Sequence, residues 1–385
     1  MSGAGQHDDA PVVLDVAGLQ ALLGALVGRG YALIGPTVRG GAVVPGPIAS
    51  VDDLPSGVGD QQEPGHYRLT ATGRTEFFGY AAPAISWKPF LFPAERVVWR
   101  AADDGTTPVA PPESAPRQAL IGVRACDLSA IQVQDRVFLQ REHVDPDYAT
   151  RRMSTFIVAV GCAHPASTCF CTSMGTGPVP DAGYDISLTE LVDTGAHRFV
   201  ATPGSPLGHD VLTELPGQAV GSDDLAAADH VGAQAVAAMG KGLGVDTFDL
   251  RDLLYANAEH LRWSEVAERC LACSNCTMAC PTCFCVTAVD TSDLGAGPAR
   301  LSVWDSCFAE GHSMLGDRPV RSTTRTRYRQ WLTHKFASWI DQFGTSGCVG
   351  CGRCITWCPA GIDVREELAA IRETTGSPGP EKARS

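Results

Sequence analysis

Eight cysteines occur in two short runs that have the same spacing. The first run, Cys-x2-Cys-x2-Cys-x3-Cys-Pro, comprises Cys270, Cys273, Cys276 and Cys280. The second run repeats this form and comprises Cys348, Cys351, Cys354 and Cys358. Three closely spaced thiolates can hold three corners of a 4Fe–4S cluster, and in two-cluster proteins the fourth cysteine of such a run ligates the other cluster. The spacing therefore predicts two clusters that share ligands between the runs.

The predicted ligand sets cross from one run to the other. We expect the first cluster to be held by Cys270, Cys273, Cys276 and Cys358. We expect the second cluster to be held by Cys348, Cys351, Cys354 and Cys280. Structural zinc is the alternative occupant, but zinc sites typically use two Cys-x2-Cys pairs separated by a spacer. Triple runs that end in Cys-Pro favour iron–sulfur clusters.

Four of the other seven cysteines follow two apolar segments, QALIGV (118–123) and TFIVAV (155–160); they are Cys126, Cys162, Cys169 and Cys171. Functional groups in α/β sheets commonly lie at the ends of strands. These four thiols could ligate a third iron–sulfur cluster, or they could be small buried apolar side chains, as free cysteines commonly are. The last three, Cys283, Cys285 and Cys307, are expected to pack around the clusters without ligating them.

Strand and helix patterns alternate in the first half of the chain. Residues 14–34 read as a helix and a strand with a turn at Gly30, and QALIGV and TFIVAV each read as a buried strand. A third such element is expected around YDISLTEL. This order predicts an α/β domain with parallel strand pairing over residues 1–220.

Helical patterns dominate the second half. DDLAAADHVGAQAVAAM and residues 246–268 read as helices, and between the cysteine runs apolar residues repeat at helical spacing over 325–343, with Gly344 as a stop. We therefore predict an all-α, helical ferredoxin-type domain with two clusters over residues 221–370. The Pro- and Gly-rich end, 371–385, is predicted to be disordered.

The connector from Arg318 to Ile340 has no acidic residue but carries six cations: Arg318, Arg321, Arg325, Arg327, Arg329 and Lys335. Cations near an anionic cluster stabilise it and raise its reduction potential. The same residues could instead dock an acidic partner or form a solvated helix face.

Composition limits the other functions. The formal net charge of −13 argues against nucleic acid as a partner, because its binding rests on a basic footprint. The sequence has neither a signal-peptide pattern nor an apolar run of membrane-spanning length, so we expect a cytoplasmic protein without membrane insertion. Because dinucleotide, phosphate-loop and hydrolase motifs are also absent from the sequence, we expect the chain to move electrons and to have no catalytic residue of its own.

Several segments together resemble one known family. The connector resembles the helical ferredoxin domain of fumarate reductase iron–sulfur subunits. With IGVRACDLSAIQVQDRVFL, VGCAHPASTCFCTSMGTGP and YALIGPTVRGGAVV, the two cysteine runs and the connector resemble the β subunit of cytoplasmic sulfhydrogenases, the soluble NADP-linked nickel–iron hydrogenases. The A subunit of anaerobic sulfite reductase is similar. The resemblance covers roughly residues 15–370.

The resemblance implies two 4Fe–4S clusters and a role in electron transfer. It implies a subunit that relays electrons between a flavin subunit binding NADP(H) and the small and large subunits of a nickel–iron hydrogenase. An electron-transfer subunit of an anaerobic sulfite reductase is the alternative. An iron–sulfur redox sensor is the alternative of another class, although no effector-binding or DNA-binding element is visible in the sequence.

Overall fold

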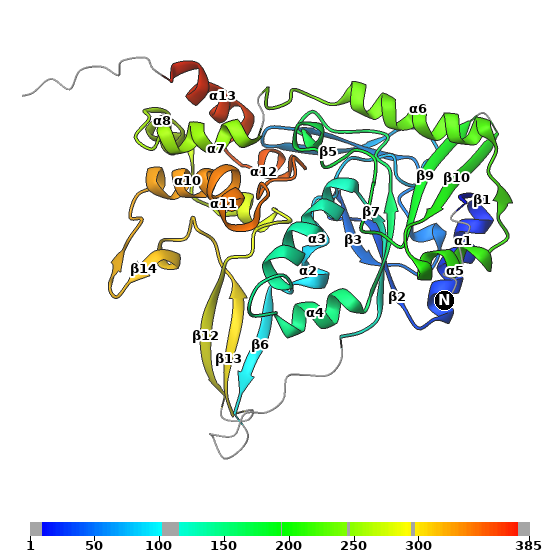
Figure 1. Ribbon diagram of the computed structural model, residues 1–385, viewed down its shortest axis with the longest axis horizontal. Coiled ribbons are helices and arrows are strands. Elements are labelled where there is room, and N and C mark those ends of the chain that lie inside the picture. Colours follow the sequence, from blue (N-terminus) through cyan, green and yellow to red (C-terminus); the bar gives the residue numbers. More distant parts are fainter. Residues whose placement is uncertain (1–9, 102–114, 194, 245–246, 294–296, 376–385) are drawn as a thin grey trace, which may run out of the picture.

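A computed structural model describes residues 10–101, 115–193, 195–244, 247–293 and 297–375 of the chain. The eight-stranded sheet lies at one end of the molecule and the helices that follow residue 246 gather at the other (Figure 1). A smaller sheet, to which both halves of the sequence contribute, projects between them.

The large sheet is mixed, with the strand order β11-β1-β10-β9-β8-β7-β2-β3. Its middle pairs, β2 with β7, β7 with β8 and β8 with β9, are parallel, and the outer pairs are antiparallel. The parallel pairing expected from the sequence is confirmed. The strands are β1 (Val12–Asp15), β2 (Ala32–Arg39), β3 (Ala42–Pro47), β7 (Gln118–Val123), β8 (Thr155–Val160), β9 (Ile186–Asp193), β10 (Ala196–Pro203) and β11 (Gln218–Ala219).

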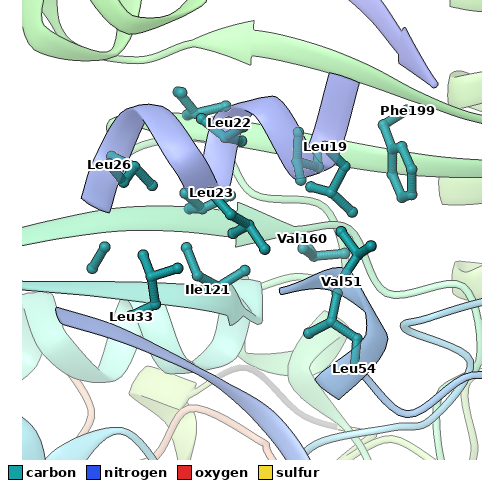
Figure 2. Close-up of a cluster of buried hydrophobic side chains, with 14 of the residues drawn as sticks. Leu19, Leu22, Leu23, Leu26, Leu33, Val51, Leu54, Ile121, Val160 and Phe199 are labelled. Atoms are coloured by element: carbon teal, nitrogen blue, oxygen red, sulfur yellow. The ribbon is translucent and has the colours of Figure 1, made fainter. Parts of the chain in front are cut away.

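Helices cover both faces of the central strands, and for this reason β7 and β8 are buried throughout and apolar after their first residue. On one face, leucines of α1 pack on Leu33, Ile121 and Val160 (Figure 2). On the other face, α2, α3 and α4 pack on Leu120 and Ile157. The helices of this part are α1 (Val16–Gly28), α2 (Lys88–Leu91), α3 (Ala125–Phe138), α4 (Pro146–Met153) and α5 (Pro206–Thr213).

The helices after residue 246 surround an aromatic core that includes Trp263, Tyr328 and Trp331. The predicted helix over 325–343 is continuous, with a π-helical segment at His334–Ser338 between α10 and α11, and it ends at Gly344 in the left-handed conformation. These helices are α7 (Thr247–Ala256), α8 (Arg262–Arg269), α9 (Asn275–Met278), α10 (Thr324–Thr333), α11 (Trp339–Phe343), α12 (Arg353–Thr356) and α13 (Val364–Thr374).

The prediction that this second part is all-α is wrong. Strands β12 (Val286–Asp293) and β13 (Gly297–Trp304) form an antiparallel pair, and β13 also pairs with β6 (Glu95–Arg100) from the first half. The alternating β-branched residues Thr287, Val289 and Thr291 signal β12 in the sequence, and β6 supplies the third strand that an isolated hairpin needs for stability. A further short pair joins β14 (Met314–Leu315) to β15 (Arg318–Pro319).

The two parts share a buried boundary. Arg353 makes two hydrogen bonds of 2.8 Å to the carboxylate of Asp127, and both side chains are 1% exposed. The hairpin of β4 (Val58–Glu63) and β5 (His66–Ala71) also reaches the second part, since the Gly65 amide donates to the Ile355 carbonyl at 3.1 Å. The first part is therefore joined directly to the segment that carries the second cysteine run.

Two elements bear on the predicted boundaries at residues 220 and 370. Helix α6 (Ser222–Ala238) packs along β9 and β10 of the large sheet. Helix α13 extends to Thr374, which corrects the prediction of disorder for residues 371–374, and residues 376–385 lie outside the described residues. The domain limits 1–220 and 221–370 stay a prediction.

Candidate metal centres

The first candidate centre is a cavity of about 430 Å³, part of it open to solvent, directly after α8. It is lined by the four cysteines of the first predicted ligand set: Cys270, Cys273, Cys276 and Cys358. Phe308, Tyr328 and Trp331 form an apolar wall. Four thiols and an apolar wall around one cavity are the kind of ligands and surroundings that a 4Fe–4S cluster uses.

The fourth cysteine of each run lies beside the other run. Burial raises the pKa of Cys270 and Cys276, and the neighbouring Cys358 raises both further. Burial likewise raises the pKa of Cys348 to about 12, with a further contribution from Cys280. Cys280 also contributes to the raised pKa values of the other two cysteines of the second run. The structure thus brings each predicted set of four together, while their ligation of iron stays a prediction.

The two runs turn in the same way. The second residue after the first cysteine has a positive φ in both, 50° at Ala272 and 65° at Gly350. In each case its amide points at that cysteine, and the distance from nitrogen to Sγ is 3.4 Å for both Cys270 and Cys348. Amide donors aimed at thiolates stabilise their charge, which is how a protein supports a cluster beyond its direct ligands.

A buried cation, Lys335, lies beside the second run. Lys335, 3% exposed, donates from Nζ to the Thr282 hydroxyl at 2.6 Å and to the Gly347 carbonyl at 3.0 Å. Burial alone would lower the pKa of Lys335, but the charges of Cys280 and nearby thiols outweigh it and raise this pKa. Lys335 is therefore held charged next to the second predicted ligand set.

The connector cations divide into different roles. Of the six, Lys335 alone is fully buried among the cysteines in the part of the chain that the structure describes. Arg325 and Arg329 each form a 2.8 Å ion pair with the exposed Glu259. Charge compensation at a candidate centre thus fits Lys335, and a solvated helix face fits Arg325 and Arg329.

Cys285 and Cys307, which we expected to pack around the clusters, lie close to His312 in the fold. The neighbouring Cys307, and then His312, lower the pKa of Cys285 to about 4. The neighbouring Cys285, together with the 2.8 Å contact of His312 with Asp305, raises the pKa of His312 to about 9. The sequence signal was weak, because His312 lies 27 positions from Cys285 and only the fold brings them together.

The four cysteines of the first half also meet. Cys126, Cys162, Cys169 and Cys171 line a second cavity of about 320 Å³, next to Arg124. Burial raises the pKa of all four thiols, that of Cys171 to about 12. Cys351 of the second run lines the same cavity.

The cysteine groups differ from a site for one ion. Among the described residues, no group of three or more His, Cys, Asp or Glu side chains is arranged to hold a single metal ion. Tetrahedral zinc at about 2.3 Å from each sulfur brings its thiolates within about 4 Å of one another. The thiolates of a 4Fe–4S cluster are separated by the width of the cluster, and sets of four cysteines around a cavity suit that arrangement.

Comparisons with known proteins give consistent results. Residues 269–362 match the family model of a 4Fe-4S dicluster domain. The chain is 35% identical over 258 residues to sulfhydrogenase 2 subunit beta of Pyrococcus furiosus. The matched segment covers 66% of this chain and 74% of that protein. No solved structure matches. Among the described residues, no helix is long and apolar enough to cross a membrane.

Proposed function

Because this chain belongs to the family of sulfhydrogenase β subunits, we propose that it is the iron–sulfur electron-transfer subunit of a cytoplasmic nickel–iron hydrogenase. It relays electrons between a flavin subunit that binds NADP(H) and the hydrogenase small and large subunits. The observation that carries the proposal is the position of Cys358 in one cavity with Cys270, Cys273 and Cys276. The three thiols of the first run are thereby joined by a fourth, Cys358, which is distant in sequence.

The donor sets fit two 4Fe–4S clusters. Each set consists of four thiols, three from one loop and one that follows the other loop, and thiolates are the ligands such clusters use. When bound, a cluster of this kind accepts and releases one electron at a time. The proposed ligands are Cys270, Cys273, Cys276 and Cys358 for one cluster, and Cys348, Cys351, Cys354 and Cys280 for the other.

The surrounding residues support these ligands in three ways. The amides of Ala272 and Gly350 point at the first cysteine of their runs. The apolar wall of Phe308 and Trp331 keeps water from one side of the first cavity. Lys335 supplies a buried positive charge at the second set. Hydrogen bonds, burial and charge are the means by which a protein sets cluster potentials.

The first test is anaerobic co-purification of the tagged full chain, with its partners identified by mass. We expect a flavin-binding subunit and a nickel-containing large subunit in the same complex. We also expect at least eight irons per chain, about four for each cluster. A sirohaem-type reductase in place of the nickel subunit would move the proposal to the sulfite reductase alternative, and zinc without iron would refute both.

A further inference from the structure

We infer that Cys126, Cys162, Cys169 and Cys171 bind a third 4Fe–4S cluster, next to the second cysteine run. The inference rests on the proposed function, which makes this chain an iron–sulfur protein, and adds a centre to it. Neither the dicluster model, which covers residues 269–362, nor the name of the relative assigns this site.

The four thiols reach one cavity from separate parts of the fold. Cys126 lies in the first turn of α3 after strand β7, and Cys162 follows strand β8. Cys169 lies on the loop after Cys162, and Cys171 begins the short 3-10 helix Cys171–Met174 that follows. All four line the same cavity, which is partly open to solvent. Cysteines that only filled a core would not be expected to gather around one cavity.

Hydrogen bonds hold the loop that presents these thiols. The Cys162 amide donates to the Pro178 carbonyl at 3.2 Å, which closes the loop at its base. The Thr176 amide donates to the Cys171 carbonyl at 3.0 Å. Gly177 is favoured over other residues, because its φ is 151° and a Cβ there would lie 3.0 Å from the Cβ of Ala125 and 3.3 Å from the sulfur of Cys171. The thiols are therefore presented by an ordered framework.

A buried cation makes the cavity suited to an anionic occupant. The Arg124 side chain, 2% exposed, lines the cavity and donates to three carbonyls, those of Phe78, Tyr80 and Gly161, at 2.6–2.7 Å. In the part of the chain that the structure describes, the Arg124 Nε has no hydrogen-bond partner, and the carboxylates of Glu190 and Asp60 interact with the guanidinium electrostatically without a direct hydrogen bond to it. A buried guanidinium is stabilised by negative charge nearby. A cluster with four thiolate ligands would add negative charge inside the cavity that Arg124 lines.

The proposed site adjoins the second run directly. Cys351 lines the cavity beside the four cysteines, while Cys354 lines the first cavity. The Phe170 amide donates to the Gly350 carbonyl at 2.8 Å, and the Thr176 hydroxyl to the Val349 carbonyl at 2.7 Å. The second run thus contributes a cysteine to the lining of each cavity and adjoins both.

A third centre beside the second run extends the electron path into the first half of the chain. An electron that passes between neighbouring clusters leaves one oxidised and the other reduced by one electron, and no bond forms or breaks. The partner that docks on the first half would exchange electrons at this third site.

The test counts iron, acid-labile sulfide and zinc in the full chain, purified anaerobically and reconstituted with ferrous iron and sulfide. We expect about twelve irons and twelve sulfides in the wild-type chain, three clusters of four irons each. Cys169→Ala should lower the count to about eight. The matched control is Cys307→Ala, which changes a half-buried cysteine that lines neither cavity. This variant should retain about twelve irons.

The outcomes separate this inference from the proposed function. About eight irons in wild type, falling to about four in Cys273→Ala, would leave the proposed function intact and overturn the third site. Eight irons with one zinc, or twelve irons in Cys169→Ala, would overturn it as well. If Cys169→Ala does not fold, Cys162→Ser and spin quantification of the reduced wild-type chain by electron paramagnetic resonance decide between two clusters and three.

Discussion

The two cysteine runs share their spacing and turn geometry but lie in different surroundings. The first run is near the surface, where Cys273 is exposed and Leu271 is 68% exposed. The second run is covered, and Cys351 is only 8% exposed. The left-handed positions of the first run are Ala272 and Ser274, with φ of 50° and 69°.

The second run has glycine at both equivalent positions, for a steric reason. A Cβ at Gly350 would lie 2.6 Å from the Cys171 amide nitrogen, and one at Gly352 would lie 2.6 Å from the Thr168 carbonyl. The loop from the first half therefore presses on the second run, while nothing comparable requires glycine in the first. Two runs of identical spacing thus differ in their surroundings: the first is open to solvent at Cys273, and the second is enclosed by residues of the first half.

Replacement of a proposed ligand should have the largest effect among the changes that test the difference between the two runs. Cys273→Ala should remove about four irons and leave the second cluster in place, because the second set does not depend on Cys273. Cys351→Ala should remove the second cluster and also disturb the neighbouring cavity that it lines. Both changes should abolish hydrogen-driven NADP reduction by the complex. Iron analysis and redox titration measure the losses, and retention of both clusters with full activity in either variant would refute the ligand assignment.

The buried ion pair of Arg353 and Asp127 should be the next most sensitive feature. Asp127→Asn leaves the guanidinium buried without its counter-charge, which typically costs about 3–5 kcal/mol. Anaerobic urea unfolding measures this loss. The control is Asp290→Asn, because the ion pair of Asp290 with Arg300 is exposed and its loss should leave the unfolding midpoint unchanged. Equal midpoints for the two variants would show that the boundary does not stabilise the second run.

Lys335→Met tests whether the positive charge of Lys335 raises the reduction potential of the cluster proposed at the second run. A unit charge at about 7 Å contributes about 2–3 kcal/mol at an effective dielectric constant of about 20, which is on the order of 100 mV for a one-electron couple. We expect the potential of the second cluster to fall by an amount of this order, with the first almost unchanged. Arg325→Met, on the same connector but paired with the exposed Glu259, is the control. A shift of equal size in both variants would favour a long-range effect of net charge instead.

His312 should give the smallest effect, visible as a pH dependence. Its pKa rises from 6.5 to about 9 in the folded chain through its bonds with Cys285 and Asp305. The resulting stability is complete below pH 6.5 and is lost as the pH rises toward 9. After allowance for partial exposure, we expect about 1 kcal/mol. His312→Gln should lower the melting temperature of the chain at pH 6.5 but not above pH 9, and a constant difference across this range would contradict the assignment.

Local patterns predicted much of the fold. The apolar segments that became β7 and β8, the helix over 325–343 and its stop at Gly344 could all be recognised, because each depends on neighbours in sequence. The hairpin of β12 and β13 was missed, since its third strand, β6, comes from a distant segment. The alternation of β-branched residues was present in the sequence but competed with the expectation of a helical domain.

For the candidate centres too, local features follow from the sequence and long-range contacts do not. The number, type and spacing of the cysteines in the two runs follow from the sequence alone, because three thiols on one short loop are a local arrangement. The spacing also predicted that the fourth cysteine of each run completes the other set. Which run is buried and which cations lie beside it depend on contacts between distant residues, such as Arg353 with Asp127 and Phe170 with Gly350. Burial and charge act through space, and only the folded chain defines which groups are neighbours there.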